Sequence, residues 1–408
     1  MAQESWEKTL YALTAAEFVA MTAFSFVGAF LPLFVQELGN FTPAQAAFWT
    51  GIASSGLGIG MFFSSSLWGI ASDRWGRKLM VLRVMLGGAV LLVVQGLSPN
   101  IYFFVATRWG QGLLTGSVAA VSAMATSIVP RNKIPLAAGL ITASASGGSS
   151  LGPVIGGFLA DQIGYRNAFF VVGALLLASA LLVIWLVKED FEPPARRETA
   201  SLGGMLRLAV SRDMLPVLIF LFAVSFIPSL TSPIIPLFIK ELNPAGRAAT
   251  AAGLTFGITG AVYTLSTLGA ARLSERFDLR KILILSCLGS GLLTLPPVWA
   301  ASVGQLLIYL VLGCFPGGGV SAASNAVVGL SVSQGQMGMA YGLSNSAGSL
   351  GWGLGPLVGG WLASIWGFRP IFAITAGLTL VGTVFVVRFL PKRLFPAFST
   401  QSESVTLS

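Results

Sequence analysis

The sequence predicts an all-α membrane protein of twelve transmembrane helices, arranged as two six-helix bundles related by pseudo-symmetry. Of its 408 residues, 54% are hydrophobic and only 10% are charged, whereas soluble proteins carry about 25% charged residues. Apolar segments recur along the chain, each long enough to cross roughly 30 Å of hydrocarbon as a helix. Several short motifs also occur twice, once in each half. Together these observations leave no room for a sizeable soluble core.

Breaks rich in Gly, Pro, Asn and charged residues separate the apolar windows and set the limits of the predicted helices. The twelve predicted spans are 10–35, 46–70, 79–98, 102–127, 136–160, 167–187, 214–239, 249–271, 282–301, 304–330, 339–364 and 370–390. The first apolar run is expected to be retained as a span, because no basic region or small-residue cleavage site of a signal peptide accompanies it.

Basic residues are distributed unevenly around these spans. If both termini are cytoplasmic, all the Lys and Arg residues lie inside except Arg108 within a span and Arg166, Lys240, Arg247 and Arg369 outside. Such an excess of inner Lys and Arg is typical of membrane proteins. It predicts a multi-pass protein of the bacterial inner (plasma) membrane with both termini cytoplasmic. The sequence pI of about 9.9 then reflects topology and contact with the lipid bilayer, and no nucleic-acid partner is expected.

One polar segment differs from the other interruptions. Residues 188–213 contain two prolines and mixed charge, as expected of a linker between domains. The predicted domains are therefore an N-terminal six-helix bundle at 1–187, a cytoplasmic linker at 188–213, and a C-terminal six-helix bundle at 214–408 with a short cytoplasmic tail.

Four motifs recur in the same order at offsets of 202 to 204 residues. They are LPLFVQEL at 31–38 and IPLFIKEL at 235–242, SDRWGRKLM at 72–80 and SERFDLRKIL at 274–283, LGPVIGG at 151–157 and LGPLVGG at 354–360, and GYR at 164–166 and GFR at 367–369. Parallel repeats of six spans are an architecture of transporters, in which a site near the midplane opens alternately to each side. The repeat therefore favours transport over a receptor or a membrane enzyme.

Three further motifs carry a resemblance to a known family. GIASDRWGRK at 69–78, RWGQG at 108–112 and GSSLGPVIGG at 148–157 match motifs A, B and C of the major facilitator superfamily. Over nearly its whole length the chain resembles the twelve-span drug:proton antiporters of that superfamily, of the tetracycline-efflux and MdtG type. The resemblance implies the major facilitator fold and transport by alternating access.

The resemblance implies that motif A latches the two halves together on the cytoplasmic side. The gating residues it assigns are Gly69, Asp73, Arg74, Gly76, Arg77 and Lys78. Asp73 could face a helix N-terminus, whose partial positive charge stabilises an anion by about 0.3–1 kcal/mol. The alternative is that the three basic residues act only as topology signals.

Proton coupling is expected to involve Glu17 and Arg108. Glu17 is the only acid within a predicted span, and a low-dielectric cavity favours the protonated form of a carboxyl group. Glu17 could therefore hold a proton at one stage and release it when a cationic substrate approaches. Arg108, with Gln111 and Gly112, forms motif B, and it should face the bundle interior because a charged residue is costly in lipid. The alternative for Glu17 is an interfacial position or a structural hydrogen bond.

The glycine and proline residues of the repeated stretches are expected to form a hinge-side seam. The assigned residues are Gly148, Gly152, Pro153, Gly156 and Gly157 of motif C, with Gly351, Gly355 and Pro356 in the second copy. Glycines four residues apart share one face of a helix and let another backbone approach closely. In the family, spans 5 and 8 meet across the halves, as do spans 2 and 11. The alternative is tight packing without a role in transport.

The substrate cavity is expected between spans 1, 4, 7 and 10, as the resemblance implies. Its candidate residues are Met21, Phe24, Phe30, Gln111, Phe220, Tyr263, Asn325 and Asn345. A mainly apolar cavity suits loosely specified hydrophobic ligands. No metal or cofactor is expected, because the chain has no histidine and its two cysteines lack metal-site spacing. No nucleotide-binding or catalytic motif is present, so an enzyme is not expected.

The leading hypothesis is a proton-coupled exporter of lipophilic drugs or small molecules, cationic ones among them, acting as a monomer and conferring antibiotic resistance. A proton-coupled uptake permease for a sugar or an organic anion is the second hypothesis, since Arg108 could bind an anion. A membrane sensor or assembly factor that does not transport is the third. The intact motifs favour transport, because a fold without transport does not need a latch.

Overall fold

The computed structural model describes residues 2–114, 117–187, 189, 202–331 and 337–390. These residues are almost entirely helical, and no strand occurs among them. The chain forms two compact units, Met1–Arg197 with Pro233–Ile258 and Glu198–Ser232 with Thr259–Ser408. The first unit thus includes a segment from the second half of the sequence.

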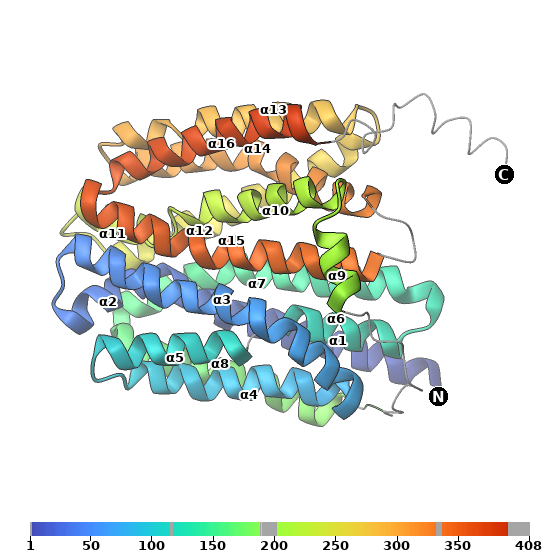
Figure 1. The fold of residues 1–408 in the computed structure, drawn as a ribbon. Coiled ribbons are helices and arrows are strands. Elements are labelled where there is room, and N and C mark those ends of the chain that lie inside the picture. The colour runs from blue at the N-terminus through green and yellow to red at the C-terminus, as the bar shows by residue number, and fades with distance from the viewer. Residues whose placement is uncertain (1, 115–116, 188, 190–201, 332–336, 391–408) are drawn as a thin grey trace. The chain divides into compact units, whose positions relative to one another are not determined.

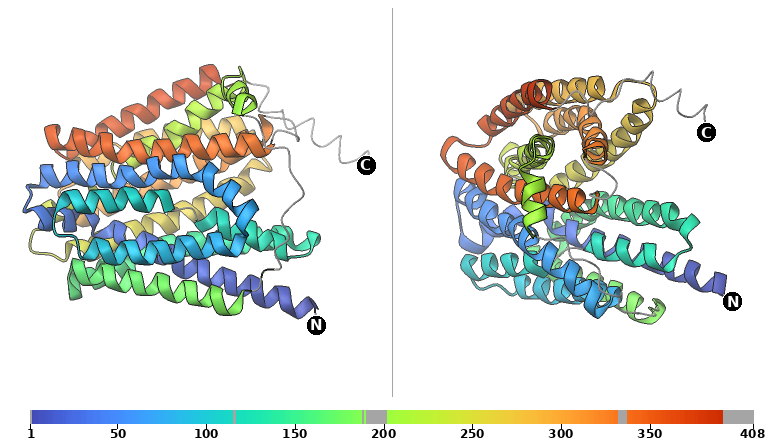
Figure 2. Two further views of the ribbon diagram at one scale, coloured as in Figure 1. Left: turned by 60° about the horizontal axis from the view of Figure 1, so that its bottom comes forward. Right: turned by 45° about the vertical axis from the view of Figure 1, so that its right-hand side comes forward.

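The first unit is built around the helix pairs α1 with α7 and α4 with α8, which lie side by side in Figures 1 and 2. Its helices are α1 (Ala2–Phe26), η1 (Val27–Ala29), α2 (Leu31–Gly39), α3 (Pro43–Trp75), α4 (Arg77–Gly96), α5 (Ile101–Leu114), α6 (Ser117–Ile128), η2 (Arg131–Lys133), α7 (Ile134–Ile163), α8 (Tyr165–Leu186) and α11 (Ile235–Leu242).

The second unit packs α10 against α15, and α13 against α14 and α16. Its helices are α9 (Leu202–Ala209), α10 (Met214–Ser229), α13 (Leu279–Leu293), η3 (Pro296–Trp299), α14 (Val303–Leu330), α15 (Met337–Trp366) and α16 (Arg369–Phe389). Helix α12 (Ala248–Ser274) begins in the first unit and continues in the second.

Eight helices among the described residues are long and apolar enough to cross a membrane. They include α3, α4, α8, α12, α14 and α16, together with the segments Trp6–Ala29 and Leu279–Trp299. Helices α7 and α15 are equally long but contain many Gly and Ser residues, which lowers their mean hydropathy. The glycine-rich composition that marks the repeated stretches therefore weakens the ordinary hydropathy signal.

Predicted spans 1 and 7 are interrupted where the sequence analysis expected continuous helices. Helix α1 ends at Phe26 and α2 begins at Leu31, and α10 ends at Ser229 before α11 begins at Ile235. Both second helices carry Pro at their N-terminal turn, where the missing N–H is tolerated. The repeated LPLF and IPLF sequences thus restart a helix.

Three connections between helices contain a glycine with a positive φ angle, which stands alone in two of them and precedes Phe368 in the third. Gly76 joins α3 to α4, Gly164 joins α7 to α8, and Gly367 joins α15 to α16, with φ angles of 93°, 84° and 79°. A residue with a Cβ is strained at these angles. Two of these glycines belong to the repeated GYR and GFR motifs, so the motif fixes the same sharp connection in each half.

Candidate functional site

The glycines of motif C bring the backbone of α7 against α1. A Cβ at Gly148 would lie 2.6 Å from the carbonyl oxygen of Phe18, and one at Gly156 would overlap with the carbonyl oxygen of Phe26. Between them, the hydroxyl of Ser25 donates to the carbonyl of Gly148 at 3.2 Å. No larger residue fits this face of α7.

The second copy makes the same contact between α15 and α10. A Cβ at Gly351 or Gly359 would overlap with the carbonyl oxygen of Phe222 or Leu230. The hydroxyl of Ser229 donates to the carbonyl of Gly351 at 3.4 Å. Each of these residues lies 203 or 204 positions after its counterpart in the first copy. The two glycine rows therefore press on the first helix of their own half.

Another face of α7 packs on the start of α12. A Cβ at Gly157 would overlap with the carbonyl oxygen of Ala249, and one at Gly253 would overlap with that of Pro153. Both segments belong to the first compact unit. Of the assigned motif C residues, Pro153 and Gly157 thus lie at the contact between predicted spans 5 and 8, where Val154 also packs against Gly257. Pro356 is buried within α15.

The described part of motif A ties the start of α4 to the end of α8. The backbone N–H groups of Arg77 and Lys78 donate to the two carboxylate oxygens of Glu189, each at 2.8 Å. The ammonium of Lys78 donates to the carbonyls of Ile184 at 3.1 Å and Val187 at 2.7 Å. A carboxylate at a helix N-terminus and a cation at a C-terminus both complement the helix dipole.

Three other motif A residues fall in α3, but their side chains and surroundings lie outside the described residues. They are Gly69, Asp73 and Arg74. The latch therefore stays a prediction. Glu189 was not among the sequence candidates, although an acid directly after a span, opposite a basic loop, is a signal that could have identified it.

Motif B forms a buried polar chain in the first unit. The guanidinium of Arg108, which is 6% exposed, donates to the side-chain oxygen of Gln111 at 3.0 Å. The amide of Gln95 donates to the same oxygen at 3.1 Å. Gly112 meets the backbone of Gly56 so closely that a Cβ would overlap with its carbonyl. Sequence analysis missed Gln95, whose signal is one amide in the otherwise apolar run LLVVQGL.

Glu17 of α1 is completely buried. Few ionisable groups in proteins are buried to this extent. Nearby on α1, Met21 is half-buried against Gly148, and Phe24 is half-buried against Gly88 of α4. Phe30 lies instead in an aromatic cluster, stacked on Tyr165 at a centroid distance of 5.9 Å. Of the aromatic cavity candidates, Phe30 is thus a packing residue.

An apolar pocket of about 90 Å³ lies within the second unit. Phe220 and Tyr263, two cavity candidates, line it together with residues of α13, α14 and α16 such as Cys287, Val320 and Thr379. Asn345 is exposed on α15, and the side chain of Asn325 lies outside the described residues. The pocket therefore gathers apolar and aromatic groups and no charged side chain.

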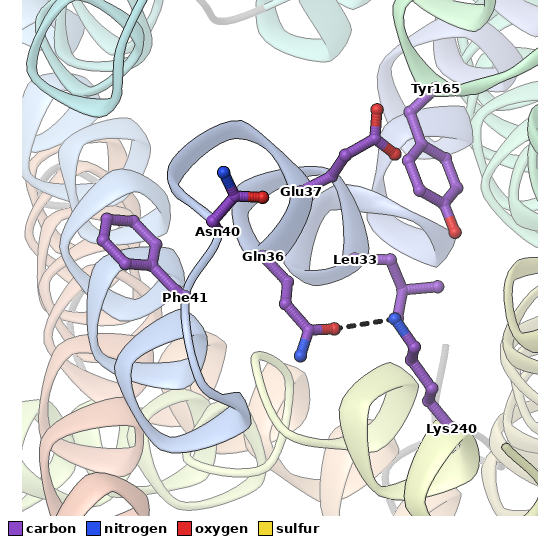
Figure 3. Close-up of a pocket in the computed structure, with 7 residues that line it drawn as sticks. All are labelled: Leu33, Gln36, Glu37, Asn40, Phe41, Tyr165 and Lys240. Carbon is purple, nitrogen blue, oxygen red and sulfur yellow. Dashed lines mark hydrogen bonds between the residues drawn. The ribbon is translucent and has the colours of Figure 1, made fainter.

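A second, polar pocket of about 420 Å³ lies in the first unit (Figure 3). Its lining residues are Leu33, Gln36, Glu37, Asn40, Phe41, Tyr165 and Lys240. The ammonium of Lys240 donates to the side-chain oxygen of Gln36 at 2.9 Å, and the Glu37 carboxylate points toward Tyr165 (Figure 3). Gln36 and Lys240 occupy the same position in the two copies of the repeated octapeptide.

Duplicated helices that pack through glycine rows, together with a buried polar chain around Arg108, are the features of a membrane transporter built from two repeats. The sequence profile of the Major Facilitator Superfamily matches residues 13–268 and 217–403. The chain belongs to this superfamily of membrane transporters, and the predicted fold class is confirmed.

Individual relatives match over nearly the full length. The chain is 30% identical over 392 residues to multidrug resistance protein MdtG of Salmonella arizonae, covering 95% of this chain and 97% of that protein. It is 31% identical over 398 residues to multidrug resistance protein MdtG of Escherichia coli O1:K1, covering 97% of each. The crystal structure of the nucleoside transporter NupG aligns with a TM-score of 0.77 at 15% identity, covering 93% of this chain and 98% of that one. The likeness to NupG shows the fold alone.

Proposed function

We propose that this protein is a proton-driven exporter of lipophilic compounds, cationic ones among them, in the bacterial inner membrane. The near-full-length similarity to multidrug resistance protein MdtG carries the proposal. The alternatives of an uptake permease and a non-transporting protein have no comparable support.

Glu17 is the proposed proton carrier. A carboxyl group removed from water favours its neutral form, and Glu17 is completely buried. A proton and a cationic substrate would then occupy this region in turn, because each is stabilised by the same carboxylate. Arg108, held by Gln111 and Gln95, supplies a fixed positive charge in the same unit. That charge favours release of the proton when water reaches the site.

The lipophilic part of a substrate is proposed to bind the apolar pocket that contains Phe220 and Tyr263. Aromatic and aliphatic walls without charges bind by burying apolar area, and they tolerate ligands of different shapes. Met21 and Phe24 of α1 are proposed to contribute in the first unit. Small molecules and protons are the expected partners, with the chain acting as a monomer.

The proposed topology has both termini in the cytoplasm and domains at 1–187 and 214–408, joined by the linker 188–213. The basic residues near the start of α4 and at the end of α12 support this orientation, because cytoplasmic loops are rich in Lys and Arg. On that side, motif A is proposed to latch the halves when the cavity is closed to the cytoplasm. The hinge-side seam formed by the glycine and proline residues of the repeated stretches is proposed to include Pro153 and Gly157.

The test is proton release from proteoliposomes with an imposed pH gradient. A lipophilic cation such as tetraphenylphosphonium should evoke proton flux from the native protein and little from Glu17→Gln. The matched control is Glu37→Gln, because Glu37 is an exposed acid on the next helix. If the native protein shows no proton flux, the proposal that it is an exporter is overturned. If the two variants show equal flux, Glu17 has no role in the coupling step.

A further inference from the structure

The first turn of α12 is held by a carboxylate from another helix. Asp161, near the end of α7, accepts hydrogen bonds from the backbone N–H and the hydroxyl of Thr250, both at 2.7 Å. The N–H groups of a first helical turn have no acceptor within their own helix. The negative charge also complements the positive end of the helix dipole.

The backbones of the two helices approach closely beside this contact. Gly157 meets Ala249, and Gly253 meets Pro153, with no space for a Cβ at either glycine. The hydroxyl of Thr250 also lies 3.4 Å from the carbonyl of Gly157. The nearest neighbours of Gly157 and Gly253 are backbone atoms, and one turn further along α12 the side chain of Val154 packs against Gly257. Asp161 and Thr250 therefore provide the polar side-chain contact at the edge of this close approach.

A second polar contact joins the two sequence halves at the same end of the unit. Lys240 of α11 donates to Gln36 of α2 in the pocket of Figure 3, which Tyr165 also lines. Tyr165 lies four residues after Asp161 and is within electrostatic reach of its carboxylate. Both contacts therefore hold segments from the second half of the sequence onto this end of the first unit.

The repeat shows that the Asp161 contact is not a general requirement of the fold. The counterpart of α12 in the first half is α3, whose first turn is capped by its own Thr42 in a capping box with Gln45. The counterpart of Asp161 is Ser364, whose hydroxyl donates within its own helix to Trp361. The start of α3 is thus capped from its own segment, whereas the start of α12 is capped by a carboxylate of another helix.

We propose that Asp161 is a positioning residue for transport, which holds the start of α12 against α7 and must release Thr250 before this end of the protein opens. Its partner Thr250 sets the strength of the contact. The inference goes beyond the proposed function, because it concerns opening at this end whatever the substrate or coupling ion is.

The test measures the accessibility of a buried position beside the contact. Ala252, one turn into α12, is completely buried. Ala252→Cys is made after replacing the free cysteines Cys287 and Cys314 by Ser, and the labelling rate with a maleimide is followed in purified protein. Asp161→Ala should raise that rate by about tenfold, as expected when a charge-assisted hydrogen bond is lost. Thr250→Val should raise it by about threefold, because its N–H remains.

Three controls separate opening from general destabilisation. Asp161→Glu should return the rate most of the way to native, and Ser364→Ala should leave it unchanged. A second reporter, Val172→Cys, is buried in α8 and should label equally slowly in every background. An unchanged rate at Ala252 in Asp161→Ala overturns the proposal, and so does an equal rise at both reporters. If Asp161→Ala does not fold, Thr250→Val alone decides. The labelling rate requires neither substrate nor protons, so a negative result does not affect the proposal that the protein is an exporter.

Discussion

The two halves of the chain share their helix contacts but fix their helix ends differently. In the first half, the start of α4 is capped by Glu189, which lies more than 110 residues away. In the second half, the equivalent start of α13 is capped by the adjacent Asp278, which accepts from the N–H of Arg280 at 2.8 Å. The two halves thus share their helix packing, whereas the first half caps α4 with a distant residue and the second caps α13 with an adjacent one.

The halves also differ in their buried polar groups. The first contains Glu17, Arg108 and Gln95, all buried. The residues about 203 positions later are Leu221, Val311 and Val298. The second half instead has the apolar pocket. We propose that proton handling and the binding of lipophilic groups are divided between the two copies of the repeat, and the predictions below test that division.

The largest expected effect is shared by the two halves. Gly156→Leu and Gly359→Leu should each destabilise the protein by at least about 3 kcal/mol, because the new side chain meets the backbone of the adjacent helix. The thermal midpoint of detergent-solubilised protein measures the loss. Gly139→Leu in α7 is the control, since nothing lies within 4 Å of a Cβ there. A native midpoint for either variant would contradict the close approach.

The next effect should occur in the first half alone. Arg108→Leu is expected to lower transport more than tenfold without lowering the thermal midpoint. A buried cation carries a desolvation cost, and its partner Gln111 keeps the hydrogen bond to Gln95. The control is Val311→Leu at the equivalent position of the second half, which should leave both measurements near native. A fall in the midpoint with transport retained would make Arg108 a structural residue.

The fold was predictable from the sequence to a large extent, and the site only in part. Apolar periodicity predicted the long helices, and the repeat predicted the duplicated glycine contacts. The break before Leu31 was missed because apolar composition is continuous across it, whereas the break before Ile235 was missed although Thr231, Ser232 and Pro233 signal it. Asp161 was missed because it caps a helix that is distant in sequence, which leaves no local signal. Glu189 was missed although an acid directly after a span, opposite a basic loop, is such a signal. Gln95 was missed because a lone amide does not reveal which helix it faces.

A smaller effect should separate the two capping arrangements. Glu189→Ala should destabilise by about 2 kcal/mol and Asp278→Ala by about 1 kcal/mol, because Glu189 accepts from two N–H groups and Asp278 from one. Thermal midpoints measure both, with the exposed Glu275→Ala as the control. The opposite order would mean that the local cap contributes more than the distant one.

The smallest effect concerns a hydrogen bond from an arginine to a backbone carbonyl, which both halves contain. Arg166 donates to the carbonyl of Gly96 at the end of α4, and Arg369 donates to that of Val298 in η3. A cation at a helix end contributes about 0.3–1 kcal/mol, so each Arg→Ala change should lower stability by roughly that amount.

The double variant sharpens the comparison further. The two arginines belong to different compact units, and effects at independent sites add to within about 0.5 kcal/mol. Additive shifts in the thermal midpoint would mean that Arg166 and Arg369 each stabilise the helices of their own unit separately. A double variant clearly less stable than the sum would mean that the stabilities of the two units are coupled.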